Sequence, residues 1–384
     1  MIPYGRQTIS EADIESVVQA LRSDFLTQGP QVPAFEEAVS RYVGAPHAVA
    51  VNSATSALHI ACLALDLGPG DWLWTSPNSF VASANCALYC GAQIDFVDID
   101  LRTYNMCTQA LSDKLIAAKK AGRLPKVVVP VHFAGQSCDM QAIANLAKEY
   151  GFKVIEDASH AIGGRWQKKN IGACEYSDIT VFSFHPVKII TTAEGGLLTT
   201  RNARIAQRLV DLRSHGITRD AARLVRQDQG AWYYEQHSLG FNYRLTELQA
   251  ALGVSQMTAL DRFVTRRHEL VVRYEQGLAD LPLIKPWQHP DSYSAFHLYV
   301  IQVADKASID RRTLFEALRT VGVLVNVHYV PIHLQPHYLR MGFKAGDFPN
   351  AEAYYNCAIS LPMYAGLTET DQDYVIANLK EFLQ

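Results

Sequence analysis

A lysine lies between two apolar segments of the chain, in a setting that favours amine chemistry. Lys188 follows Pro186 and Val187 and precedes Ile189 and Ile190. An ammonium group in apolar surroundings loses hydration, so its pKa falls and its free amine becomes available as a nucleophile. A lone lysine more often extends its charged end into water. Lys188 therefore indicates catalysis only if other segments provide a cofactor site.

A turn of small polar residues at 52–57 follows one apolar run and leads into a predicted helix. At the start of such a helix the backbone N–H groups of Ala54 and Thr55 have no partner within the helix, and they lie at the positive end of its dipole. These features suit a phosphate group. Taken alone, the turn is better explained as an ordinary N-cap formed by Asn52 or Ser53.

Four more side chains come from the ends of predicted strands, where open α/β sheets bind ligands. The Asp157 carboxylate would suit a cationic ring nitrogen or cap a helix, and His160 would face the same ligand or a local carbonyl. The Ser183 hydroxyl would bind a phosphate or local backbone, and Phe80 would lie on a ring or in the core. With Lys188, these groups are what pyridoxal phosphate (PLP) requires: a Schiff-base amine, an acidic partner for the pyridine nitrogen and phosphate anchors.

The composition is that of an ordinary globular protein. Of the 384 residues, 48% are hydrophobic and 19% are charged. A net charge of -3 offers no basic surface to a nucleic-acid backbone, so we expect no nucleic-acid partner. No apolar segment has the length of a membrane span and the first residues lack a signal-peptide pattern, so we expect no membrane attachment. Seven scattered cysteines without a CxxC pair are typical of reduced thiols, which predicts a cytoplasmic enzyme.

The elements that would position these residues alternate along the chain. Short apolar runs that predict strands are separated by segments of helical spacing; the runs are residues 47–51, 72–75, 94–97, 127–132 and 154–156. Such alternation is typical of a mostly parallel sheet with helices on both faces. After about residue 260 a smaller α+β pattern follows. We therefore predict an α/β fold with a large domain, residues 1–260, and a small C-terminal domain, residues 261–384.

The sequence resembles the DegT/DnrJ/StrS family of fold-type I, PLP-dependent sugar aminotransferases over essentially all of its length. The segments that carry the resemblance are LTQGP at 26–30, NSATSAL at 52–58, SFVASAN at 79–85, EDASHA at 156–161, FSFHPVKIITTAEGG at 182–196, RSHG at 213–216, GFNYRLTELQAALG at 240–253 and VHYVPIH at 327–333. FHPVKIITTAEGG and HFAGQS at 132–137 further resemble the pseudaminic acid branch, which makes UDP-4-amino-4,6-dideoxy-N-acetyl-β-L-altrosamine.

This resemblance implies a role for each candidate around a PLP ring. Lys188 would form the Schiff base with the cofactor, and Asp157 would pair with the pyridine nitrogen. Phe80 would stack on the ring. His160 stands where much of the family has glutamine, and it would contact the ring hydroxyl.

The resemblance also implies a homodimer with shared active sites. Ala54, Thr55 and Ser183 would hold the phosphate, and Asn242 would reach the phosphate bound by the neighbouring subunit. The substrate contacts would come from two segments and one tyrosine: Tyr4, Asp24, Phe25, Leu26, Thr27, Asn326, Val327, His328 and Tyr329.

The implied reaction is a ping-pong transamination. L-glutamate would give its amino group to the cofactor and leave as 2-oxoglutarate, and the 4-keto group of a UDP-4-keto-6-deoxy-N-acetylhexosamine would then receive it. Lys188 would move the proton between cofactor and sugar as a general acid and base. A different nucleotide-linked 4-keto-6-deoxy sugar is the alternative substrate.

The sequence allows three other interpretations. A dehydratase of the same family carries histidine in place of the lysine, so Lys188 opposes that assignment. A non-catalytic sugar-binding regulator is opposed by the complete set of Asp157, Ser183, Lys188 and Asn242.

A metal site is the third alternative, because three histidines follow one another at 328, 333 and 337. Pro331 and Pro336 interrupt that stretch, so the histidines do not share one helical face. We therefore predict no metal, and we expect loop or structural histidines there.

Overall fold

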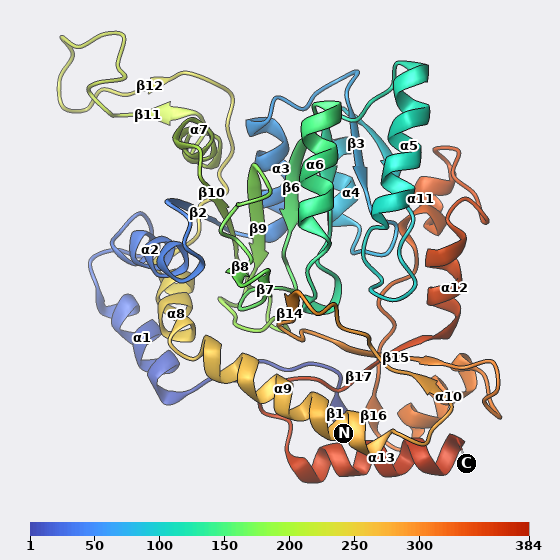
Figure 1. Ribbon diagram of the computed structural model, residues 1–384. Helices are drawn as coiled ribbons and strands as arrows, with labels where there is room; N and C mark the ends of the chain where they lie inside the picture. The colour runs from blue at the N-terminus through green and yellow to red at the C-terminus, as the bar shows by residue number, and fades with distance from the viewer. Residues whose placement is uncertain (384) are drawn as a thin grey trace.

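A seven-stranded sheet forms the centre of the computed structural model, which describes residues 1–383 (Figure 1). Its order is β2-β10-β9-β6-β5-β3-β4. The strands are β2 (His47–Val51), β3 (Trp72–Thr75), β4 (Gln93–Phe96), β5 (Val127–Val129), β6 (Lys153–Asp157), β9 (Ile179–Ser183) and β10 (Gly196–Thr200). β10 pairs antiparallel with β2 and β9, whereas the other neighbours pair in parallel. The predicted mostly parallel sheet of an α/β fold is confirmed.

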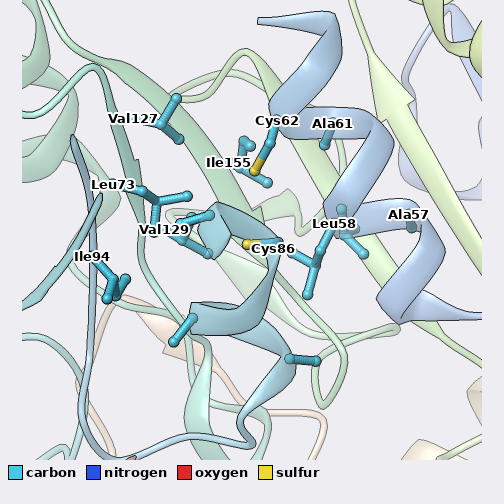
Figure 2. Packing of buried hydrophobic residues seen from close by; sticks show 14 of the residues in the cluster. Ala57, Leu58, Ala61, Cys62, Leu73, Cys86, Ile94, Val127, Val129 and Ile155 are labelled. Carbon is cyan, nitrogen blue, oxygen red and sulfur yellow. The ribbon is translucent and has the colours of Figure 1, made fainter. Parts of the chain in front are cut away.

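Helices cover both faces of this sheet, because its strands are apolar on both sides. Val127 and Val129 pack with α3 (Ala54–Ala64) and α4 (Ala82–Tyr89), and Figure 2 shows Val129 beside Cys86 of α4. Val128, which points to the other face, packs with α5 (Thr108–Ala121) and α6 (Met140–Tyr150). This alternation follows from the two-residue period of a strand.

The helix boundaries follow local capping chemistry. Asp139 accepts a hydrogen bond from the N–H of Ala142 at the start of α6, and Gly151 ends that helix in the left-handed conformation. Ser10 and Asp13 form a capping box at the start of α1 (Glu11–Arg22). In both cases the helix end is set by a residue type that caps helices.

The C-terminal part of the chain contains a three-stranded antiparallel sheet, β13-β15-β17. Its elements are β13 (Leu283–Ile284), β15 (Tyr299–Val303), β17 (Ala358–Leu361), α9 (Leu260–Gly277), α10 (Arg311–Thr320) and α13 (Glu369–Leu383). The N-terminal strand β1 (Ile2–Pro3) joins this part by pairing in parallel with β16 (Val323–Leu324). Figure 1 accordingly shows both chain ends beside α13. The domain boundary at residue 260 stays a prediction.

The remaining elements lie around the two sheets. They are α2 (Gln31–Val43), α7 (Ala203–Arg213), α8 (Glu247–Met257), α11 (Pro336–Leu339), α12 (Pro349–Cys357), β7 (Arg165–Trp166), β8 (Lys169–Asn170), β14 (Ser292–Tyr293), β11 (Ile217–Thr218) and β12 (Glu235–Gln236). β11 and β12 form an arm that projects from the body in Figure 1. None of the helices within residues 1–383 combines the length and apolar character that a membrane span needs.

Candidate active site

The candidate residues gather at the carboxyl ends of two adjacent parallel strands. Asp157 is the last residue of β6 and Ser183 the last of β9, and Lys188 follows in the turn after β9. β6 and β9 pair in parallel, with Asp157 opposite Val181. The ends of parallel strands meet at one edge of a sheet, where α/β folds bind their ligands. The predicted location of the site at this edge agrees with the structure.

Lys188 is partly buried, and its pKa lies well below that of an ordinary lysine. Burial is the main cause and lowers the pKa to about 8, against the opposing attraction of the Asp157 carboxylate. Burial disfavours the charged ammonium form. A substantial fraction of the free amine is therefore present near neutral pH, as the apolar surroundings predict.

The Asp157 carboxylate is 4% exposed and is held by serine side chains. Ser83 Oγ donates to its Oδ2 at 2.6 Å, while Ser159 donates to Oδ1 from both its N–H, at 3.1 Å, and its Oγ, at 2.6 Å. A turn follows Asp157, so the alternative of a helix cap is wrong. The carboxylate is therefore fixed at the strand end.

The start of α3 forms a cradle of unpaired backbone N–H groups. Ser53 is the N-cap and accepts from Ser56 N–H at 3.1 Å, so the N-cap interpretation is correct. The first two amides of the helix, those of Ala54 and Thr55, have no acceptor within it. The N-cap and a phosphate-binding helix start are therefore compatible with each other.

Gly196 brings the Ser183 strand end against this helix start. It pairs with Ser183 across the sheet, and a Cβ built on it would lie 2.5 Å from the carbonyl carbon of Ser53 and 2.6 Å from Ala54 N. Only glycine permits such a close approach. Ser183 therefore adjoins the cradle.

A cavity of about 360 Å³ opens beside the cradle. Its lining residues come from three segments: Thr55, Ser56, His59, Tyr89 and Tyr243. Asn242, next to Tyr243, is exposed, and Tyr243 C=O accepts from Asn52 N–H at 2.8 Å. The GFNYR segment therefore lies at the phosphate side of the site and presents Asn242 to solvent.

Phe80 is 59% exposed, although Ser79 and Ser83 beside it are buried. The alternative that Phe80 belongs to the core is wrong. Its nearest aromatic partner within the described chain is Tyr329, with 6.4 Å between ring centroids. An exposed aromatic ring at the strand ends is available to cover a planar ligand.

His160 has both ring nitrogens engaged. Its Nδ1 accepts from Ala134 N–H at 3.3 Å, and its Nε2 lies 3.2 Å from Tyr329 Oη. Burial, followed by the positive charge of nearby Lys188, keeps its pKa well below the usual value. The neutral ring therefore carries its proton on Nε2 and donates it to Tyr329. The local partner is an N–H group and not a carbonyl, and a contact to the cofactor hydroxyl stays a prediction.

Five of the predicted substrate residues lie together near Lys188. The rings of Tyr4 and His328 are 5.2 Å apart, and the next residue, Gly5, packs against Val187. Asn326 donates to His328 Nε2 at 3.4 Å, and burial followed by Lys188 lowers the pKa of His328 to about 3. Tyr329 completes this group. The N–H of Val327 donates a hydrogen bond to Asn326 Oδ1 at 2.8 Å.

The other predicted substrate residues, Asp24, Phe25, Leu26 and Thr27, are not part of that group. Their segment contacts the start of α8: Thr27 bridges to Thr246, and Leu26 C=O accepts from Glu247 N–H at 3.1 Å. All four side chains are exposed. The predicted substrate set is therefore divided between the Lys188 region and an outward-facing loop.

His297 is a residue of the site that sequence reasoning missed. It is 3% exposed, its ring centroid lies 4.4 Å from that of His160, and its Nδ1 has no hydrogen-bond partner within residues 1–383. Burial, followed by the neighbouring His160 ring and Lys188, holds its pKa well below the usual value. It stands just before β15, far along the chain from every motif, so no local spacing pointed to it.

No group of three or more His, Cys, Asp or Glu side chains in the described part of the chain is arranged to hold a metal ion. Two of the three histidines of the alternative metal site have other hydrogen-bond partners. His328 Nδ1 lies 2.8 Å from Ser360 Oγ, and His333 Nε2 lies 2.8 Å from Glu352.

The donor set fits PLP. A planar pyridine ring with a phosphate and an aldehyde needs an amine, a carboxylate, unpaired N–H groups and an aromatic cover. Lys188, Asp157, the start of α3 and Phe80 supply one of each at the same edge of the sheet.

Comparisons with known proteins agree with this chemistry. The spore coat polysaccharide biosynthesis protein SpsC of Bacillus subtilis is 40% identical over 387 residues, covering 100% of this chain and 97% of that protein. Helicobacter pylori PseC, an aminotransferase involved in pseudoaminic acid biosynthesis, has a TM-score of 0.90 at 31% identity, covering 100% of this chain and 99% of that one. Spr1654 of Streptococcus pneumoniae in its PLP form has a TM-score of 0.89 at 29% identity, covering 99% and 98%.

A family model matches nearly the whole chain, residues 7–380, and its description is the DegT/DnrJ/EryC1/StrS aminotransferase family. The solved relatives with PLP and the donor set of the site agree on the cofactor. The chain therefore belongs to the DegT/DnrJ/EryC1/StrS family and is a PLP-dependent sugar aminotransferase.

Proposed function

We propose that this enzyme transfers the amino group of L-glutamate to C4 of a UDP-4-keto-6-deoxy-N-acetylhexosamine, a step of pseudaminic acid biosynthesis. The observation that carries the amino-transfer chemistry is that Asp157 ends β6 while Lys188, whose pKa is lowered, lies in the turn after the adjacent parallel strand β9. The similarity to PseC over the full chain supports the pathway. A cytoplasmic location stays a prediction.

PLP, when bound, supplies an electron sink for the carbon that loses its proton. Asp157 holds a proton on the ring nitrogen, and Phe80 covers one ring face. The amides of Ala54 and Thr55 and the Ser183 hydroxyl bind the phosphate. These contacts fix the position of the ring relative to the Lys188 amine.

Lys188 accepts and returns the proton that moves between substrate and cofactor. Its lowered pKa provides both the free amine as a base and the ammonium as an acid near neutral pH. The adjacent imidazoles of His160 and His328 stay neutral because their pKa values are lowered, so they do not compete for that proton. Tyr4, Asn326 and Tyr329 would contact the sugar; Tyr4 lies beside His328, and Tyr329 beside His160.

A homodimer explains the outward-facing residues of the predicted site. Asn242 and the loop at 24–27 are exposed in the single chain, as they would be if they served a neighbouring subunit. In such a dimer Asn242 completes the phosphate site of the neighbour, and each active site contains residues of both chains.

The test is an assay of the purified enzyme with glutamate and a panel of UDP-, dTDP- and GDP-linked 4-keto-6-deoxy sugars. We expect amino product from the UDP-linked N-acetylated sugar, with NMR giving the configuration at C4. The Lys188→Ala variant, assayed in parallel, should be inactive and still folded. Product from another nucleotide sugar alone would exclude the proposed substrate.

A different 4-keto sugar is the second candidate, and the similarity to SpsC favours it. That relative is 40% identical and is a spore coat polysaccharide biosynthesis protein. The same panel separates the two candidates.

A further inference from the structure

A chain of buried hydroxyl groups ends on the Asp157 carboxylate. Ser83, in α4, is fully buried and its Oγ lies 2.6 Å from Asp157 Oδ2. Ser79 is 3% exposed, and its Oγ lies 2.8 Å from Ser83 Oγ. Neither serine has a role in the function proposed above, although their chain ends on Asp157, the residue proposed to bind the ring nitrogen.

The direction of this chain follows from the chemistry of its last member. A carboxylate only accepts hydrogen bonds, so the Ser83 hydroxyl must donate its single proton to Asp157. Ser83 Oγ can then act towards Ser79 only as an acceptor, so Ser79 donates to Ser83. Hydrogen bonds aligned in one direction polarise and strengthen one another, the more so where burial excludes water.

A count of donors shows which carboxylate oxygen remains available. A carboxylate offers about four acceptor positions, two on each oxygen. Ser159 fills both positions of Oδ1 with its N–H and its hydroxyl. Ser83 fills one position of Oδ2. The free acceptor position is therefore on Oδ2, the same oxygen that Ser83 contacts.

We propose that Ser83 is a positioning residue for the cofactor ring: its hydroxyl, supported by Ser79, turns Oδ2 of Asp157 towards the ring nitrogen. This inference rests on the proposed role of Asp157. Ser159 anchors the other oxygen, Oδ1. Ser83 and Ser159 together therefore fix the plane of the Asp157 carboxylate.

The same short segment carries the proposed aromatic cover. Phe80 lies between Ser79 and Ser83 in the sequence and is 59% exposed, while both serines are buried. One turn of chain therefore presents an aromatic ring outward and two hydroxyl groups inward. The ring cover and the orientation of the ring-nitrogen partner are set by one segment.

The test compares two ligands that differ at the ring nitrogen only: PLP and its analogue with C–H in place of that nitrogen. Affinities for the apoenzyme come from absorbance titration, without turnover. We expect Ser83→Ala to weaken PLP binding about 10-fold, because a hydrogen bond to a charged group is lost. The Ser83→Ala variant should bind the analogue as tightly as the wild-type enzyme does, because the analogue has no ring nitrogen to bond with Oδ2 of Asp157.

Three further variants complete the test. Ser83→Cys keeps the volume and a weak donor, so its loss should be smaller than that of alanine. Ser79→Ala should weaken PLP binding less than Ser83→Ala. Ser137→Ala is the matched control, because it removes a buried hydroxyl that bonds the Cys138 carbonyl and does not contact Asp157.

An equal loss for both ligands in Ser83→Ala would mean a merely structural serine and would overturn the inference. Asp157→Ala separates this failure from a failure of the proposed function. If Asp157→Ala removes the preference for PLP over the analogue and Ser83→Ala keeps it, only the role of Ser83 is wrong. If Asp157→Ala keeps the preference, the role of Asp157 is wrong, and that of Ser83 with it.

Discussion

The Lys188 amine makes cofactor capture depend on pH. Only the free amine attacks an aldehyde, and the pKa of about 8 means that its fraction rises with pH up to about that value. We expect the rate of PLP uptake by the apoenzyme to rise about tenfold per pH unit well below pH 8 and to level off above it. Stopped-flow absorbance measures this rate.

Asp157→Asn is the informative variant for this prediction. The carboxylate raises the pKa of Lys188, so its removal should move the levelling-off to lower pH. A rate that still rises at about pH 10, as for an ordinary lysine, would contradict a lowered pKa.

At the residue scale, chemical type and position were predictable but partners were not. Asp157, Ser183 and Lys188 stand at the ends of apolar runs, and strand ends were readable from the sequence. Ser83 and His297 reach the site through tertiary packing of α4 and of the chain before β15. Contacts made by tertiary packing leave no pattern of spacing in the sequence, so neither residue could be predicted as part of the site.

At the scale of elements, the meeting of β10 with α3 depends on one glycine. A Cβ at Gly196 would lie within 2.6 Å of backbone atoms of Ser53 and Ala54, which side-chain rotation cannot relieve. Gly196→Ala should therefore displace the helix start, destabilise the fold by about 1–3 kcal/mol and weaken PLP binding. Thermal unfolding and absorbance titration measure the two effects.

Gly68→Ala is the control for this prediction. A Cβ there meets nothing within 4 Å, so stability and cofactor binding should stay close to those of the wild type. Equal behaviour of the two variants would show that the approach of β10 to α3 is not tight.

Element boundaries were predictable where local chemistry decides them. The ends of α6 follow from Asp139 and Gly151, and β2 and β3 were predicted to the residue. α4 was not predicted, because five of its eight residues are buried and it shows no polar face. The pairing of β1 with β16 joins opposite ends of the chain, and sequence reasoning had no signal for it.

At the scale of the whole molecule, the proposed dimer predicts complementation between two inactive proteins. Lys188→Ala removes the amine of a site, and Asn242→Ala removes the phosphate contact that we assign to the neighbour. A mixed dimer would have one site with both defects and one intact site. After equal mixing and subunit exchange we expect about a quarter of the wild-type activity, since half of the dimers are mixed.

Ultracentrifugation of the mixture verifies that the mass is that of a dimer. A mixture that stays as inactive as its components, although mixed dimers form, would place Asn242 in the site of its own subunit. Exchange is confirmed by co-purification of a tagged variant with an untagged one.

The strand pair β1–β16 sets the order in which the enzyme can mature on the ribosome. Ile2 pairs with Val323, so β1 must wait for the synthesis of a long stretch of polypeptide before its partner strand exists. Tyr4 follows directly on that strand and meets His328. During synthesis this contact can form only after residue 328 has been made, later than the Lys188 segment and the strands of the seven-stranded sheet.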